Sequence, residues 1–146
     1  MRPYDAREVA EYIVWYCNQH NKPINNYRLN ITLYYVQAQF LLAFGEPCFW
    51  NIIRAYNHGP IVPAVYQKYK SYAATNIIGY EKEWPFTNDE LEAINRTVDV
   101  ASECSVETLQ DIATNQDPWI AAYLDSYDDT IAPESIKRFF VLHNSI

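Results

Sequence analysis

The sequence predicts a mainly α-helical fold: a single compact helical domain over residues 1–146, with about six helices and one short β-hairpin. Three observations lead to this prediction. Apolar residues recur at i, i+3, i+4 and i+7 through most of the chain, which is the spacing of one helix face. Helix-capping residues precede several of these segments. Glycine occurs only three times, and two of these glycines lie with three prolines in residues 44–69.

Two helices are predicted in the N-terminal third of the chain. The first covers residues 5–20, where Asp5 and Glu8 form an acidic variant of the capping box. Its apolar stripe contains Val9, Tyr12, Ile13 and Tyr16. Asn25-Asn26 then caps a second helix over residues 27–44. This second helix is apolar nearly all round, which is typical of a central, buried helix.

Residues 44–69 contain the strongest turn signals. Gly45 ends the second helix, because glycine accepts the left-handed conformation after a helix at little steric cost, and Pro47 prevents the helix from resuming. We expect Gly59-Pro60 to form a turn. Pro63 suits the first position of a third helix that extends to about residue 72.

A short β-hairpin is predicted from two segments. Residues 49–56 are rich in aromatic and β-branched side chains, which are typical of a strand. Ile77-Ile78 has the same character. We therefore expect residues 49–56 and residues 77–80 to pair with each other.

Three capping patterns divide the C-terminal half into helices. Thr87-Asn88-Asp89-Glu90 is a capping box, and Ser105 is a further N-cap residue. Asp117-Pro118-Trp119 begins another helix, with Asp at the N-cap and Pro at the first helical position. The first two of these helices are expected to end near residues 102 and 114. A last helix is predicted over residues 133–143, with Ile136, Phe139 and Phe140 facing inward.

The net charge of −7 is unevenly distributed. Residues 1–80 carry a net +3, from seven Lys/Arg and four Asp/Glu, whereas residues 81–146 carry a net −10, from four Lys/Arg and fourteen Asp/Glu. An acidic half repels nucleic-acid phosphates and attracts a basic partner, so we do not expect nucleic-acid binding. The alternative interpretation is that these carboxylates form only a solvated surface.

Cysteine usage and hydropathy indicate a cytoplasmic protein. The sequence has three scattered cysteines, Cys17, Cys48 and Cys104. They form no CxxC pair, and the first residues do not resemble a signal peptide, so we expect free thiols in a reducing cytosol. The most apolar run, residues 31–44, is interrupted by Gln37 and Gln39 and is too short to cross a bilayer. No membrane association is expected.

Aromatic side chains are numerous, with thirteen Tyr and four Trp. Tyrosine combines an apolar ring with a polar tip, so it suits half-buried positions and interfaces. One interpretation is a protein-binding surface, and the other is that Tyr replaces Phe in the core. An exposed aromatic patch would serve a partner protein or a homodimer equally well.

No residue pattern predicts a metal site, a cofactor site or a catalytic centre. The three histidines do not stand at zinc-ligand spacing from one another or from cysteine. Asp128-Asp129 lacks the alternating oxygen ligands of a calcium loop, which favours a solvated surface. An enzyme would have to use Cys48 as nucleophile and His58 as base, and nothing in the sequence orients that pair. We therefore expect a protein that is not an enzyme and that binds no cofactor.

Five sequence elements resemble a known family in their order. Lys22-Pro23-Ile24-Asn25-Asn26 precedes Leu33-Tyr34-Tyr35-Val36-Gln37. Phe44-Gly45-Glu46-Pro47-Cys48-Phe49 follows, and then Ala55-Tyr56-Asn57-His58-Gly59-Pro60-Ile61-Val62-Pro63-Ala64-Val65-Tyr66. Asp117-Pro118-Trp119 stands near the end. Together they resemble the Panacea domain family, the GepA-like and SocA-like proteins of phages, prophages and other mobile elements, over nearly the whole chain.

The chain departs from the family pattern at two places. Leu29-Asn30-Ile31-Thr32 stands where the family commonly has Leu-Gln-Lys-Leu. Ala113-Thr114-Asn115-Gln116 stands where the family often has Thr-His-x-Glu before the Pro-Trp pair.

The resemblance implies a function in protein binding. Family members resemble antitoxins, cytoplasmic proteins that neutralise a cognate toxin encoded nearby, and SocA-like members also act as adaptors that deliver the toxin to a protease. The alternative is a phage or prophage accessory protein that binds and inhibits a host or defence protein. The expected partner is therefore a cognate toxin or a host protein, with a protease as a further partner of an adaptor.

The candidate surface lies in the segment from residue 56 to residue 66 and at the Pro-Trp pair. The resemblance assigns eight residues to partner binding or to the framework: Tyr56, His58, Gly59, Pro60, Val62, Pro63, Tyr66 and Trp119. Within this set, Gly59 and Pro60 are expected to shape a turn. Trp119, at the start of a helix, is expected to anchor the core.

Overall fold

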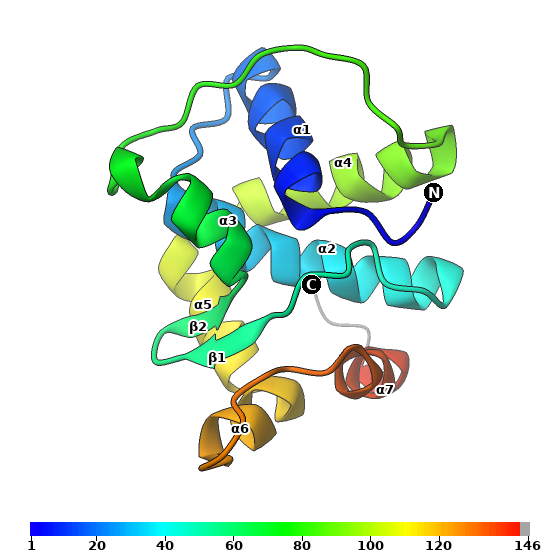
Figure 1. Cartoon of the computed structure of the whole chain (residues 1–146), viewed down its shortest axis with the longest axis vertical. Coiled ribbons are helices and arrows are strands. Elements are labelled where there is room, and N and C mark those ends of the chain that lie inside the picture. The colour runs from blue at the N-terminus through cyan, green and yellow to red at the C-terminus, as the bar shows by residue number, and fades with distance from the viewer. Residues whose placement is uncertain (144–146) are drawn as a thin grey trace.

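Helix α2 (Asn26–Phe44) crosses the middle of the molecule and packs against α1, α3, α4, α5, α7 and strand β2 (Figure 1). Thirteen of its nineteen residues are buried, so the prediction of a central helix is confirmed. The Asn25 side chain caps it by accepting a hydrogen bond from the Arg28 N–H, and Gly45 ends it with a φ of 72°. That φ lies in the left-handed region that glycine adopts at little cost.

The computed structural model describes residues 1–143, which are mainly α-helical as predicted. These residues form seven α-helices, where about six were expected. Besides α2, the helices are α1 (Ala6–Gln19), α3 (Pro63–Lys68), α4 (Asn88–Ser102), α5 (Val106–Thr114), α6 (Asp117–Leu124) and α7 (Pro133–His143). In Figure 1, α1 and α4 lie on one side of α2 and α7 lies on the other. Among the described residues, no helix combines the length and the apolar character needed to cross a lipid bilayer.

Local capping signals placed most helix boundaries correctly. The predicted capping box of α4 is formed: the Thr87 hydroxyl accepts from the Glu90 N–H, and the Glu90 carboxylate accepts from the Thr87 N–H at 2.8 Å. At α1, Asp5 caps through the Arg7 N–H, but Glu8 lies 3.7 Å from Lys82 instead of completing the predicted box.

Two helix predictions need correction. The third helix, expected to reach residue 72, ends at Lys68 and is followed by a separate 3₁₀ turn, η1 (Lys70–Tyr72). The N-cap of α6 is Gln116 in an extended conformation, not Asp117. Asp117 and Pro118 both belong to the first turn of α6. There the carboxylate of Asp117 interacts favourably with the helix dipole, and a proline costs no hydrogen bond.

Glu90 also connects the N-terminal segment to α4 through hydrogen bonds. Its carboxylate accepts hydrogen bonds from the Tyr4 hydroxyl at 2.6 Å and from the Arg2 guanidinium at 3.0 Å. Burial acts to raise the pKa of Glu90, but these donors and the Thr87 N–H outweigh it, so the net pKa lies below its ordinary value. The carboxylate therefore stays charged in a nearly fully buried position.

The hairpin exists, but the predicted pairing was wrong. Strand β1 (Arg54–Tyr56) pairs antiparallel with β2 (Gly59–Ile61), with Ala55 opposite Pro60. Gly59-Pro60 therefore lies within a strand, and Asn57-His58 forms the turn. Gly59 takes a φ of 148°, which few other residues adopt, and proline is tolerated on a short edge strand.

Residues 77–80 bond to α1 and to the loop that precedes α2 instead of pairing with β1. The Ile77 N–H donates to the Ile24 carbonyl at 2.8 Å, and the Gly79 N–H donates to the Asn18 side chain at 2.7 Å. A methyl group at Gly79 would meet the Val14 side chain at 2.9 Å, so glycine is needed for this close approach. Residues 73–87, which we call the strap, run past the outer side of α1 to reach α4 (Figure 1).

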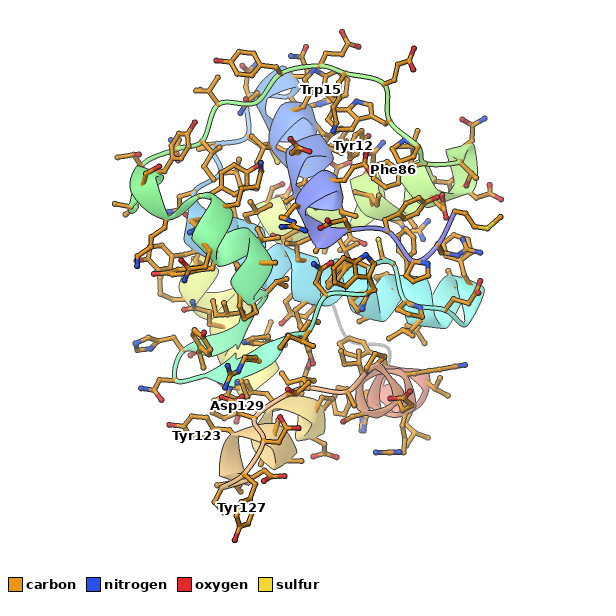
Figure 2. All side chains as sticks on the ribbon, in the orientation of Figure 1. Tyr12, Trp15, Phe86, Tyr123, Tyr127 and Asp129 are labelled. Atoms are coloured by element: carbon orange, nitrogen blue, oxygen red, sulfur yellow. The ribbon has the colours of Figure 1, made fainter. Side chains whose placement is uncertain are left out.

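Tyrosine is found both in the core and on the surface. Six tyrosines are buried in the core: Tyr4, Tyr12, Tyr16, Tyr34, Tyr35 and Tyr69. Tyr12 meets Phe86 of the strap with ring centroids 5.7 Å apart and Trp15 with centroids 5.9 Å apart, and Figure 2 labels these three residues. Other tyrosines are exposed: Tyr27, Tyr56, Tyr80, Tyr123 and Tyr127.

Amide side chains on α2 support the irregular segments that pack around it. Gln37, which the sequence showed as a break in an apolar run, is 2% exposed. Its Oε1 accepts from the Cys48 N–H at 2.8 Å and the Phe49 N–H at 3.2 Å, and its Nε2 donates to the Phe49 carbonyl at 3.0 Å. One side chain thus satisfies three buried backbone groups that no helix or sheet supplies with partners.

We predict that Gln37→Leu lowers the free energy of unfolding by about 2–4 kcal/mol, because it leaves three buried backbone groups without partners. Urea denaturation measures this loss. The matched control is Gln39→Leu, two residues along α2, at a half-exposed position without a side-chain hydrogen bond inside residues 1–143. The control should change stability by less than about 1 kcal/mol. Equal effects of the two substitutions would contradict the account.

Candidate functional site

A groove with a volume of about 930 Å³ lies between the β-hairpin, the start of α5 and the chain after α6. We call it the hairpin groove. Its aromatic lining consists of Tyr27, Tyr56, Tyr66 and Tyr123, and its acidic lining consists of Glu107, Asp125 and Asp129. The hairpin and the N-cap of α2 contribute further polar, small and aliphatic residues: Asn25, Ala55, Asn57, His58, Gly59 and Ile61. Val106 and Gln110 contribute from α5.

The tyrosines come from four separate parts of the chain. Tyr27 lies on α2 and Tyr66 on α3, and their rings meet edge to face with centroids 6.4 Å apart. Tyr56 ends β1, and Tyr123 lies on α6. Tyr27, Tyr56 and Tyr123 are each about two-fifths exposed, at 41%, 41% and 43%. Rings that are partly exposed and held by neighbours are well suited to contact another molecule.

The charge of the groove is one-sided. Three carboxylates line it, and none of its fifteen lining residues is Lys or Arg. Arg54, outside the lining, donates to Asp129 with the Nε and Oδ1 atoms 2.7 Å apart. Within residues 1–143, neither Glu107 nor Asp125 is found within 4.0 Å of a cationic group. The groove therefore presents a negative potential to any molecule that enters it.

The hairpin is held by α6 and by the chain that follows it, so this wall of the groove is well defined. The Trp119 Nε1–H donates to the Tyr56 carbonyl at 2.9 Å. The Trp119 ring stacks on Tyr123 with centroids 4.4 Å apart, and the Tyr123 hydroxyl donates to Asn57 at 2.8 Å. A further hydrogen bond joins β1 to the chain after α6: the Ala55 N–H donates to the Asp129 carbonyl.

The eight residues predicted from the sequence separate into two groups. Tyr56, His58, Gly59 and Tyr66 line the groove. The remaining four, Pro60, Val62, Pro63 and Trp119, do not line it.

The residues of the second group belong to the segments that form the groove walls, but they do not face the groove. Val62 is fully buried, and its N–H donates to the Asn30 side chain at 2.9 Å. Pro63 begins α3. Trp119 is half-buried, packs against the core and joins α6 to β1 through its hydrogen bond to Tyr56.

Among the tyrosines and carboxylates that line the groove, sequence reasoning missed five: Tyr27, Glu107, Tyr123, Asp125 and Asp129. Only Tyr123 left a local signal, because it stands four residues after Trp119 and therefore shares its helix face. The acidic residues looked like any other carboxylates of the acidic half.

The structure places Cys48 and His58 in different surroundings. Cys48 is fully buried beside α2, and burial raises the pKa of its thiol well above the ordinary value. His58 is exposed at the hairpin turn and lines the groove, whereas Cys48 does not. All three cysteines are free thiols, as predicted. In the part of the chain that the structure describes, no three His, Cys, Asp or Glu side chains gather as metal ligands would.

The comparison with protein families gave one match. Residues 29–120 match the family model described as antitoxin SocA-like, Panacea domain. This segment runs from the first turn of α2 to the first turn of α6, so it contains the whole hairpin and Trp119. Neither the curated proteins nor the solved structures gave a match to the chain.

We predict that Trp119→Phe lowers the free energy of unfolding by about 1 kcal/mol, because it removes the hydrogen bond to Tyr56 and keeps an aromatic ring against Tyr123. Trp119→Ala should cost about 3 kcal/mol, since the ring contacts are lost as well. Thermal and urea unfolding measure both values. Trp50→Phe is the control, because Trp50 is 60% exposed, and it should be nearly neutral. A Trp119→Phe variant as stable as the wild type would show that the bond to the hairpin contributes nothing.

Proposed function

The chain belongs to the antitoxin SocA-like, Panacea-domain family, and from this premise we propose that it neutralises a toxin protein by binding it through the hairpin groove. The family match carries the antitoxin part of this proposal. The groove carries the choice of surface, because it combines exposed aromatic rings, a one-sided charge and rigid walls.

The composition of the groove suits a protein partner. Interfaces are enriched in tyrosine and tryptophan, and a few buried aromatic anchors supply most of the binding energy. Four tyrosines surround this groove, and three of them expose two-fifths of their surface. A partner that covers Tyr27, Tyr56 and Tyr123 would remove a large apolar area from water while their hydroxyl groups keep polar contacts.

The proposed action is binding and not catalysis, in the cytoplasm where the toxin acts. Cys48, the one thiol that the sequence offered as a nucleophile, is buried and has a raised pKa, which supports this view. An adaptor role, in which the bound toxin is passed to a protease, is a further step that the same surface would permit. It requires a second contact site on the outside of the complex.

The partner can be identified by co-expressing the chain with the reading frame next to its gene. Affinity purification and mass spectrometry then show what is bound, and a growth assay shows whether the neighbour is toxic alone. Recovery of a neighbour that is toxic only without this chain supports the antitoxin proposal. Recovery of a host or defence protein instead would support an inhibitory phage accessory protein. Recovery of the chain alone, with a harmless neighbour, would contradict both.

We predict that Tyr27→Ala and Tyr66→Ala each weaken toxin binding by about 2 kcal/mol, roughly 30-fold in the dissociation constant, because both remove aromatic groove surface. Isothermal titration with the purified toxin measures the affinity. Tyr80→Ala is the matched control, since Tyr80 is 81% exposed on the strap and does not line the groove. Circular dichroism verifies that all three variants are folded. Full affinity in both groove variants would place the binding surface elsewhere.

A further inference from the structure

We propose that the hairpin groove recognises a basic segment of its protein partner, with an arginine side chain seated between the tyrosine rings and the carboxylates of Glu107 and Asp125. This inference rests on the proposed function for the identity of the partner as a toxin. The chemistry of the site itself is argued from the groove alone.

The first observation is the charge of the groove. Its lining contains three carboxylates and no Lys or Arg. Arg54 already engages Asp129, whereas Glu107 and Asp125 have no cationic partner inside the described range 1–143. A cation that enters the groove therefore finds two carboxylates whose charge no Lys or Arg of the described residues neutralises. A partner with negative charge, including nucleic-acid phosphate, is repelled by the same groups.

The second observation is that the carboxylates share the groove with aromatic rings. A cation placed over a tyrosine ring within about 6 Å of its centre is attracted by the electrons of the ring. Arginine makes this contact and donates two parallel hydrogen bonds to a carboxylate at the same time, because its guanidinium is planar. Lysine has a compact charge without that geometry. The combination of rings and carboxylates therefore favours arginine over lysine.

The third observation is that the outer edge of β1, which faces away from β2, is already paired with another part of the chain. Arg54 forms an antiparallel bridge with Thr130, and the Ile131 N–H donates to the Ile53 carbonyl at 2.8 Å. A partner strand therefore cannot extend the hairpin on this side. Along this edge a partner can contribute only side chains that enter the groove, which agrees with a single inserted arginine.

The fourth observation disfavours a second copy of the chain as the occupant. A symmetric dimer places the same patch of both copies against itself. Here that contact would bring two sets of the carboxylates of Glu107, Asp125 and Asp129 together. Like charges at a desolvated interface cost several kcal/mol, so the groove is poorly suited to self-association.

Because the walls are fixed before binding, the groove loses little conformational freedom when it is filled. Trp119 and Tyr123 hold the hairpin turn, and Asn30 holds the residue that follows β2. Such pre-organisation leaves more of the interaction energy for affinity. It also predicts that the side chains change little between the free and bound states.

The probe is the peptide acetyl-Gly-Arg-Gly-Arg-Gly-amide, titrated into ¹⁵N-labelled protein and followed by chemical shifts. Its counterparts replace both arginines with lysine or with citrulline, which keeps the shape of arginine and lacks the charge. The arginine peptide should bind at least tenfold more tightly than the citrulline peptide. Its shifts should centre on residues 56–58, 107–110 and 123–129. Equal binding of the arginine and citrulline peptides, or shifts elsewhere, would overturn the proposal.

Matched variants distinguish a local site from the general acidity of the chain. The double variant Glu107→Gln, Asp125→Asn removes two charges from the groove, and asparagine keeps the oxygen that accepts from the Tyr127 and Asp128 N–H groups. Glu81→Gln, Glu83→Gln removes two charges from the exposed strap. The groove variant should bind the arginine peptide about tenfold more weakly than the wild type. The affinity of the strap variant should change less than twofold. Equal losses would show non-specific attraction and overturn the proposal.

The toxin growth assay separates this inference from the proposed function. If Tyr27→Ala and Tyr66→Ala abolish neutralisation while the groove charge variant neutralises fully, the groove binds the toxin without a cation, and only the present inference fails. If none of the groove variants affects neutralisation, the groove is not the toxin-binding surface and both fail. Loss of neutralisation in the tyrosine and charge variants, with the strap variant unaffected, supports both.

Discussion

The hydrogen bonds that the buried amides of α2 make to the irregular chain around it are the interaction on which the rest of this structure depends. A central helix surrounded only by other helices needs no polar side chains in its buried faces. Here residues 45–53 and 62 pack against α2 without regular secondary structure, and their backbone groups still require partners. Gln37 supplies them at Cys48 and Phe49, and Asn30 supplies one at Val62. Asn26 continues the series by donating to the Tyr66 carbonyl.

These contacts connect the core to the proposed binding surface. Asn30 holds Val62, which connects β2 to α3, and Asn26 holds Tyr66 within α3, where its ring meets Tyr27 at the groove. On the opposite side, Trp119 and Tyr123 of α6 hold the hairpin turn. The groove is thus formed by the hairpin, by residues of four helices (α2, α3, α5 and α6) and by the chain after α6. Its acidic side comes from the C-terminal half, where most of the negative charge of the chain is concentrated.

Most of the helical architecture was predictable from the sequence because its signals are local. Thr87 and Glu90 form their capping box within one helical turn, and Gly45 ends α2 through its own φ angle. The partner of β1 was not predictable in the same way. Residues 77–80 had the composition of a strand, but Gly79 is needed for contact with α1, a feature set by tertiary packing. The role of Gln37 was equally hidden, since its partners lie eleven and twelve residues away.

The groove was only half predictable for the same reason. Tyr56 and Tyr66 lie in one motif, whereas Tyr27, Glu107 and Asp125 reach the groove through long-range packing.

The central claim is that the hairpin groove binds the toxin partner. Its most direct test is hydrogen–deuterium exchange of the chain, alone and in complex with that partner. The account predicts that binding slows exchange at residues 54–61, 106–110 and 123–129. Protection confined to the strap or to α7, with the groove exchanging as in the free chain, would contradict it.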